Sequence, residues 1–106
     1  MDAVEHVRLF NDAVTSGRWE PFTDRFAVDA ELVFVGVPAG PFIGRQAIAQ
    51  AYRESPPDDT IAINGAPRRD GDAIVVPYRW NRTNETGTMR LTSKGGLITK
   101  LVVTFG

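Results

Sequence analysis

The sequence has 106 residues, of which 42% are hydrophobic and 24% are charged, and this composition fits one globular domain spanning residues 1–106. Its formal net charge is −1, with basic and acidic residues mixed along the chain, so no basic surface for nucleic acid is expected. Cysteine is absent, no apolar run approaches the roughly 20 residues of a membrane span, and the N-terminus lacks the pattern of a signal peptide, so we expect a cytoplasmic protein without disulfides.

Three helices are predicted in the first half of the chain. Residues 2–16 repeat apolar side chains at helical spacing, and Gly17 follows as a C-cap. A short second helix is expected over residues 19–26, with Pro21 in its first turn, where a missing N–H costs little. A third helix is expected over residues 45–54, because two prolines follow shortly afterwards and stop it.

The second half of the chain changes from a helical to an alternating pattern, which is typical of strands. Arg68–Arg69, followed by acidic residues, is interpreted as a solvated turn, and the glycine- and proline-rich residues 37–44 as a loop or a short edge strand. Helices gathered early and strands gathered late indicate an α+β fold in which helices cover one face of a curved, mainly antiparallel sheet. The predicted strands span residues 31–35, 60–64, 72–81, 87–92 and 97–105.

Four short segments, taken in order, resemble a known family. They are FAVDAEL at residues 26–32, GRQAIAQAY at 44–52, MRL at 89–91 and GGLI at 95–98. Together they resemble the SnoaL-like and ketosteroid isomerase-like branch of the nuclear transport factor 2-like superfamily. The resemblance implies a cone-shaped, cystatin-like roll in which three helices close a pocket on the concave face of the sheet. Members of the superfamily include isomerases, polyketide cyclases, dehydratases, epoxide hydrolases and binding proteins without catalysis, so the fold alone does not choose a reaction.

The resemblance also shows which residues stand where ketosteroid isomerases keep their catalytic groups. The tyrosine of the first helix falls at Phe10, the general base falls at Phe34 or Val35, and the second acid falls at Gly87. None of these side chains moves a proton or stabilises an oxyanion. Tyr52 alone matches a family position, the tyrosine of the third helix. Steroid isomerisation by the family mechanism is therefore not expected.

Alternation along the strands predicts which side chains enter the pocket. On residues 72–81, Tyr78 and Trp80 share the apolar face, which we expect to be the concave one, and Leu101, Val103 and Phe105 follow the same rule on the last strand. Such residues serve as pocket walls or as ordinary core. The predicted ligand-binding residues are Phe10, Phe34, Tyr52, Tyr78, Trp80 and Val103.

Three polar residues are candidates for catalysis. The hydroxyl of Tyr52 is a donor to a ligand oxygen, or else the polar end of a core tyrosine. His6, the only histidine, lies one helical turn before Phe10 and is a base facing the pocket or an inert, half-exposed residue. Glu85 shares the inward parity of its strand but sits among turn-forming residues, so it is either a buried acid or a solvated turn residue. With one histidine and no cysteine, neither a metal nor another cofactor is expected.

Two functions remain open on the sequence alone. The first is a pocket that binds a small apolar metabolite, with a cofactor-independent isomerase or cyclase reaction as its chemistry if it is an enzyme. The second is a non-catalytic dimerisation module whose cavity is filled by its own side chains, which contact between Phe10 and Trp80 would favour. A homodimer through the convex face of the sheet is also predicted, because Val75, Ile98 and Val102 would otherwise be exposed there.

Overall fold

The computed structural model describes residues 2–106 and begins with helix α1, Ala3–Ser16. The Asp2 side chain caps this helix by accepting a hydrogen bond from the Glu5 amide at 2.7 Å. At the other end Gly17 adopts φ 77° and its N–H donates to the Ala13 carbonyl at 2.9 Å, as expected for a glycine C-cap. The helix buries one face, formed by Ala3, His6, Val7, Phe10 and Ala13.

Helix α2, Glu20–Thr23, is shorter than the predicted 19–26, because Phe26 already belongs to strand β1, Phe26–Val35. The predicted start of this strand at residue 31 was late. Between Phe26 and Glu31 the pairing of β1 with its neighbour is irregular, so the first half of the strand lacks a clean alternation of buried and exposed residues. Helix α3, Arg45–Glu54, has the predicted bounds and buries Ile48 and Tyr52.

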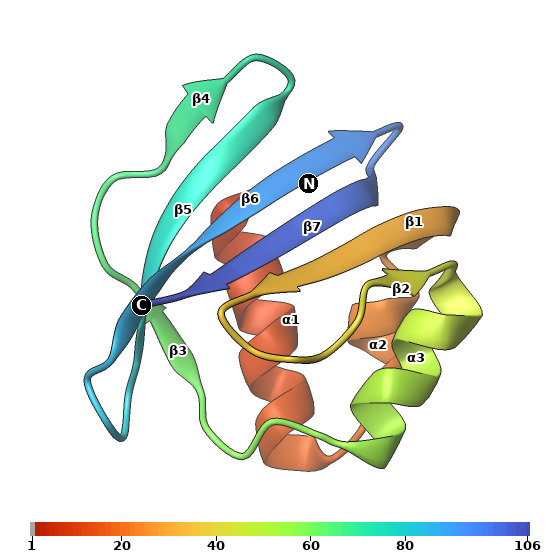
Figure 1. The fold of residues 1–106 in the computed structure, drawn as a ribbon, viewed down its shortest axis with the longest axis horizontal. Coiled ribbons are helices and arrows are strands. Elements are labelled where there is room, and N and C mark those ends of the chain that lie inside the picture. Colours follow the sequence, from red (N-terminus) through yellow and green to blue (C-terminus); the bar gives the residue numbers. More distant parts are fainter. Residues whose placement is uncertain (1) are drawn as a thin grey trace.

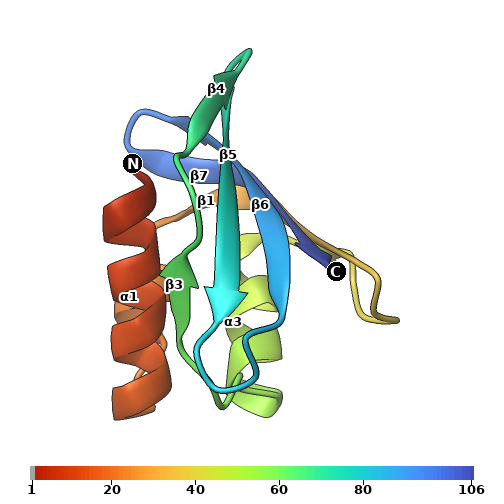
Figure 2. The same cartoon turned by 90° about the vertical axis from the view of Figure 1, so that its left-hand side faces the viewer.

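The strands form one curved sheet, and the three helices pack on one side of it (Figures 1 and 2). The order is β2-β1-β7-β6-β5-β3, with β4 paired to β5; β1 and β7 are parallel, and the other pairs are antiparallel. This confirms the predicted α+β roll. The remaining strands are β2 Phe42–Ile43, β3 Ile61–Ile63, β4 Arg68–Asp70, β5 Ala73–Trp80, β6 Thr86–Lys94 and β7 Leu97–Phe105.

Strand β4 corrects the prediction of a solvated turn at Arg68–Arg69. Arg68 pairs with Val75 and Asp70 pairs with Ala73, so the segment is the first arm of a hairpin that turns at Gly71. All three residues of β4 are exposed. A strand that is exposed on both faces has no alternation of apolar and polar residues, and its sequence therefore resembles that of a loop.

A second correction concerns Ile98, which was predicted on the convex face and is instead 0% exposed. The β6–β7 ladder pairs Thr92 with Lys100 but Ser93 with Ile98, so Thr99 is an extra residue on β7. Residues three positions apart point to opposite faces of a regular strand. Because the bulge reverses the alternation, Ile98 and Leu101 both lie in the core.

Asn11 fixes helix α1 against strand β3. Its side-chain amide donates to the Ile61 carbonyl at 2.9 Å, and its carbonyl oxygen accepts from the Ile61 amide at 2.9 Å. The Asn11 amide thus takes the place of a neighbouring strand for one residue of β3. This contact holds the buried face of α1 opposite the concave face of the sheet.

Candidate ligand pocket

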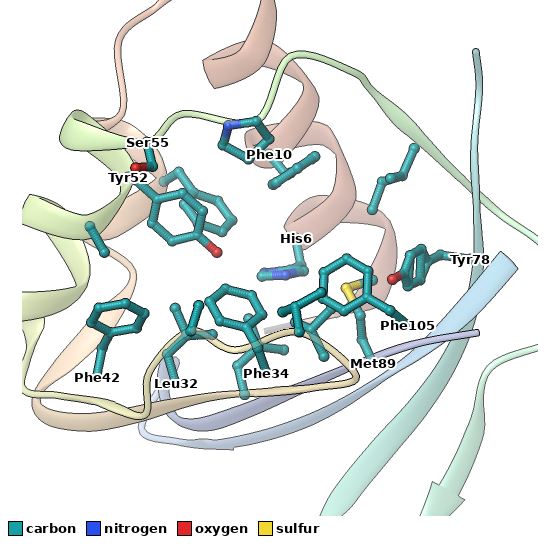
Figure 3. Close-up of a pocket in the computed structure, with 18 of the residues that line it drawn as sticks. His6, Phe10, Leu32, Phe34, Phe42, Tyr52, Ser55, Tyr78, Met89 and Phe105 are labelled. Carbon is teal, nitrogen blue, oxygen red and sulfur yellow. The ribbon is translucent and has the colours of Figure 1, made fainter. Parts of the chain in front are cut away.

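A cavity of about 440 Å³ lies between the concave face of the sheet and the helices (Figure 3). The predicted wall residues Phe10, Phe34, Tyr52, Tyr78, Trp80 and Val103 all line it, and so does His6. The other lining residues are Phe22, Leu32, Val37, Ala39, Phe42, Ala51, Glu54, Ser55, Pro57, Ile61, Met89, Leu101 and Phe105.

The wall contains a set of aromatic rings that hold one another in place. Phe10 meets Trp80 edge-on with 6.3 Å between ring centroids, and Trp80 stacks on Phe105 at 6.4 Å and 11°. Phe34 contacts Phe105 at 6.0 Å and Phe42 at 6.2 Å. Because each ring rests on another, the shape of the wall is set before any ligand binds.

Tyr52 presents a fixed hydroxyl to the cavity. Its ring stacks on Trp19 with centroids 4.7 Å apart and 15° between the planes, and meets Phe22 edge-on at 5.3 Å. Figure 3 shows the hydroxyl pointing into the cavity. Burial raises the pKa of Tyr52 well above its ordinary value, because the phenolate would be desolvated. At neutral pH this group is therefore a hydrogen-bond donor.

The Tyr78 hydroxyl is held by a main-chain group. It reaches across β6 and donates to the Thr104 carbonyl on β7 at 3.3 Å. Burial raises the pKa of Tyr78. The ring passes over Gly87, the residue paired with Tyr78 on β6. A Cβ at position 87 would lie 2.3 Å from the Thr104 oxygen and 2.6 Å from the Tyr78 hydroxyl oxygen. The position of the second acid of ketosteroid isomerases thus has no room for a side chain.

His6 lies in the wall as a neutral imidazole. It is 3% exposed, and its ring centroid lies 5.2 Å from that of Phe22. Desolvation by burial lowers the pKa of His6 to about 4, so at neutral pH it carries no charge. Its Nδ1 atom has no hydrogen-bond partner among residues 2–106. The interpretation of His6 as a half-exposed residue is therefore wrong.

Glu85 does not reach the cavity. It is exposed in the connection between β5 and β6, where its carbonyl accepts a hydrogen bond from the Trp80 amide at 2.8 Å. The regular strand begins at Thr86, and Asn84 has φ 62°, so the inward parity does not extend to residue 85. This corrects the interpretation of Glu85 as a buried acid.

Sequence reasoning missed the residues at the mouth of the cavity. Val37 and Ala39 come from the loop before β2, and Glu54 and Ser55 from the end of α3; all four are exposed. The position of such a loop depends on tertiary packing, so no spacing rule finds it. Phe22 was recognised as an apolar residue of its helix, but its contact with both His6 and Tyr52 was not foreseen.

The described part of the chain offers no metal site. Within residues 2–106, no three His, Cys, Asp or Glu side chains are grouped so as to hold an ion. In the same range, none of the helices is both long enough and apolar enough to cross a membrane.

Comparison with known proteins places this geometry in a family. Residues 7–100 match the SnoaL-like domain family. No match was found among curated proteins. Among solved structures, a provisionally named polyketide cyclase from Sinorhizobium meliloti is 20% identical with a TM-score of 0.69, and covers 93% of each chain.

Two further structures have the same fold. A provisionally named isomerase from Bacillus subtilis is 14% identical with a TM-score of 0.75, covering 98% of this chain and 86% of its own. A protein with a ketosteroid isomerase-like fold from Catenulispora acidiphila, in complex with trimethylamine, is 17% identical with a TM-score of 0.75, covering 96% and 85%. At these identities the likeness concerns the fold. Because the family match spans most of the sequence, the chain belongs to the SnoaL-like domain family.

Proposed function

We propose that this protein binds a small, largely apolar molecule in the cavity between the sheet and the helices. The observation that carries the proposal is the cavity itself, about 440 Å³ in volume and walled mainly by aromatic and aliphatic side chains. A volume of this order is typical of small-molecule sites, in which a few polar groups set the orientation of the ligand. Here the hydroxyl of Tyr52 and the imidazole of His6 are such groups.

If the protein is an enzyme, its chemistry is proton transfer without a cofactor. Tyr52 would donate a hydrogen bond to an oxygen of the ligand, and His6 would be the base, a weak one because burial disfavours its protonated form. Isomerisation and cyclisation are reactions of this kind. The names of the Sinorhizobium and Bacillus structures agree with this class of chemistry. The mechanism of ketosteroid isomerases does not apply, because Phe10, Phe34 and Gly87 stand at the positions of its catalytic side chains.

A dimerisation module with a self-filled cavity is the second candidate, and the contact between Phe10 and Trp80 favours it. The same rings, however, border the cavity rather than close it.

We also propose that two copies associate through the convex face of the sheet. On this face Val33 is the strand partner of Val102, and Arg90 is the strand partner of both Val102 and Val75. A Val102→Glu variant should then sediment as a monomer at concentrations where the wild type sediments as a dimer.

A thermal-shift screen against steroid-like, polyketide-like and terpenoid compounds tests the binding function. A ligand present at 100 times its dissociation constant adds about 2.7 kcal/mol of stability, a shift of several degrees for a chain of this size. Val103→Phe would fill the cavity and abolish the shift. Val4→Phe, the same substitution at a residue of α1 that is 68% exposed and does not line the cavity, is the matched control and should retain it. Silence across the panel would favour the dimerisation module.

A further inference from the structure

The cavity has an apolar deep end and a polar rim. Its lining residues with almost no exposed surface, at 0–1%, are Phe22, Leu32, Tyr78 and Leu101. The exposed lining residues include Glu54 and Ser55 at the end of helix α3, and Figure 3 shows Ser55 beside Tyr52 there. A ligand with an apolar body and one charged group can therefore enter body first and keep its charge at the rim, in contact with water.

The charge at the rim comes from Glu54. Among the described residues, no other carboxylate and no lysine or arginine lines the cavity, and burial keeps the imidazole of His6 neutral, with a pKa of about 4. The Glu54 carboxylate accepts a hydrogen bond from the Gln50 side-chain amide at 3.3 Å, and it forms no ion pair within residues 2–106. It is therefore available to a cation from outside the chain.

The cations closest in sequence and in the adjoining loop have other surroundings. Arg53 precedes Glu54 but borders a second groove, which Val14 and Trp19 also line. Arg82 pairs with Asp58 at 3.0 Å. Neither guanidinium lies against the Glu54 carboxylate, so the rim of the cavity keeps its negative charge.

The end of α3 adds acceptors of the same sign. The last carbonyl groups of an α-helix have no partner inside the helix, and this end carries about half a negative charge. The Ser55 N–H donates to the Ala51 carbonyl at 3.0 Å, but Pro56 and Pro57 follow and have no N–H to donate. The later carbonyls of α3 therefore lack the main-chain donors that usually cap a helix, and they lie beside the Glu54 carboxylate.

We propose that the ligand of this cavity is an amphiphilic amine, with its apolar body inside and its protonated nitrogen at the rim, between the Glu54 carboxylate and the end of α3. An ammonium group has both a positive charge and N–H donors, so it suits the carboxylate and the helix carbonyls together. A carboxylate or phosphate group would be repelled at the same place. This inference rests on the proposed binding function and deepens it by naming the ligand class.

Three naphthalene derivatives test the ligand class with the body held constant. The amine 2-(2-naphthyl)ethylamine is a cation at neutral pH, 2-(2-naphthyl)ethanol is uncharged, and 2-naphthylacetate is an anion. In calorimetric titrations at low salt, the wild type should bind the amine about fivefold more tightly than the alcohol, and the acid most weakly. Because the rim is exposed, the advantage of the amine should shrink in about 0.5 M salt.

Substitutions at position 54 assign the preference to the carboxylate. Glu54 is exposed, so its variants should fold like the wild type. Glu54→Gln should bring the amine to within about twofold of the alcohol, the remainder coming from the end of α3. Glu54→Lys should make the acid the tightest of the three. Glu20→Gln, the same change at an exposed residue of α2 that does not line the cavity, is the matched control and should keep the wild-type order.

The outcomes separate the inference from the function beneath it. If the wild type binds the acid or the alcohol as tightly as the amine, the ligand class is wrong while the pocket function stands. A preference for the amine that survives unchanged in Glu54→Gln would overturn the assignment to the rim. Failure of all three probes to bind would remove the pocket function and this inference with it.

Discussion

Tyr78 and Gly87 face each other across β5 and β6, and the phenol ring of Tyr78 occupies the space in which a side chain at position 87 would lie. The ring can then reach the Thr104 carbonyl on the next strand, to which its hydroxyl donates at 3.3 Å. Covering a strand glycine with the aromatic ring of its cross-strand partner stabilises the sheet at that point. The relationship explains why the position of the family's second acid cannot simply be refilled.

Gly87→Ala should accordingly be destabilising. The added Cβ would lie 2.3 Å from the main-chain oxygen of Thr104, which cannot move without disturbing β7. Overpacking of this kind costs about 1–3 kcal/mol. Urea unfolding measures the change, with Thr88→Ala on the exposed neighbouring position as the control. A Gly87→Ala protein within about 0.5 kcal/mol of the wild type, which is the range of ordinary surface substitutions, would contradict the packing described here.

The bulge at Thr99 predicts a contrast between two isoleucines. Ile98 is 0% exposed, so Ile98→Ala should lower the free energy of unfolding by about 2–5 kcal/mol. Ile43, on the edge strand β2, is 62% exposed, and Ile43→Ala should change it by no more than about 0.5 kcal/mol. Similar losses in the two variants, measured by chemical denaturation, would mean that β7 runs without the bulge and turns Ile98 outward.

Trp19 should matter for the site although it does not line the cavity. It is 4% exposed and stacks on the Tyr52 ring at 4.7 Å. Trp19→Ala should therefore lower the free energy of unfolding by about 3–5 kcal/mol. Trp19→Phe keeps an aromatic face against Tyr52 and should lose less. If Trp19→Ala keeps both wild-type stability and wild-type ligand affinity, the stacking does not position Tyr52.

Burial of His6 makes stability depend on pH in a defined window. The pKa of His6 is about 4 in the folded chain, against an ordinary value of about 6.5. Between these values the unfolded chain binds the proton and the folded chain does not, so the free energy of unfolding falls as the pH falls from 6.5 to 4. Above pH 6.5 the protonation of His6 does not reduce the free energy of unfolding; below pH 4 it has reduced it by about 3 kcal/mol.

His6→Phe provides the control for this dependence. The variant has no imidazole to protonate, so its stability curve should be flatter than that of the wild type between pH 6.5 and 5, above the range in which exposed carboxyl groups titrate. Denaturant unfolding at several pH values gives both curves. Parallel curves would show that His6 is solvated in the folded protein and would remove the basis for a neutral imidazole in the cavity wall.

Much of the fold follows from local patterns in the sequence. Helix α3 has the predicted bounds because a regular apolar stripe precedes two prolines, and β7 has them because apolar residues alternate up to Phe105. Other features have no local signal. Strand β4 exposes every side chain, and the bulge at Thr99 reverses an alternation that looks regular in the sequence.

The site divides in the same way. The alternation along β5 and β7 predicts which of their side chains face the cavity, and Tyr78, Trp80, Leu101 and Val103 lie on that face. The depth of His6, the covering of Gly87 and the loop residues at the mouth depend on how separate elements meet. Glu85 was misplaced because it lies before Thr86, the first residue of β6, so the parity of the strand does not extend to it.

The most direct test of the pocket is to locate a bound ligand by NMR. Titration with 2-naphthol should shift the indole signal of Trp80 and the amide signals of Phe34 and Val103, in a saturable way and with one dissociation constant. Signals of residues on the outer face of the sheet, such as Thr88 and Val102, should stay in place. Shifts confined to that outer face, or no saturable shift at all, would contradict a ligand-binding cavity between the sheet and the helices.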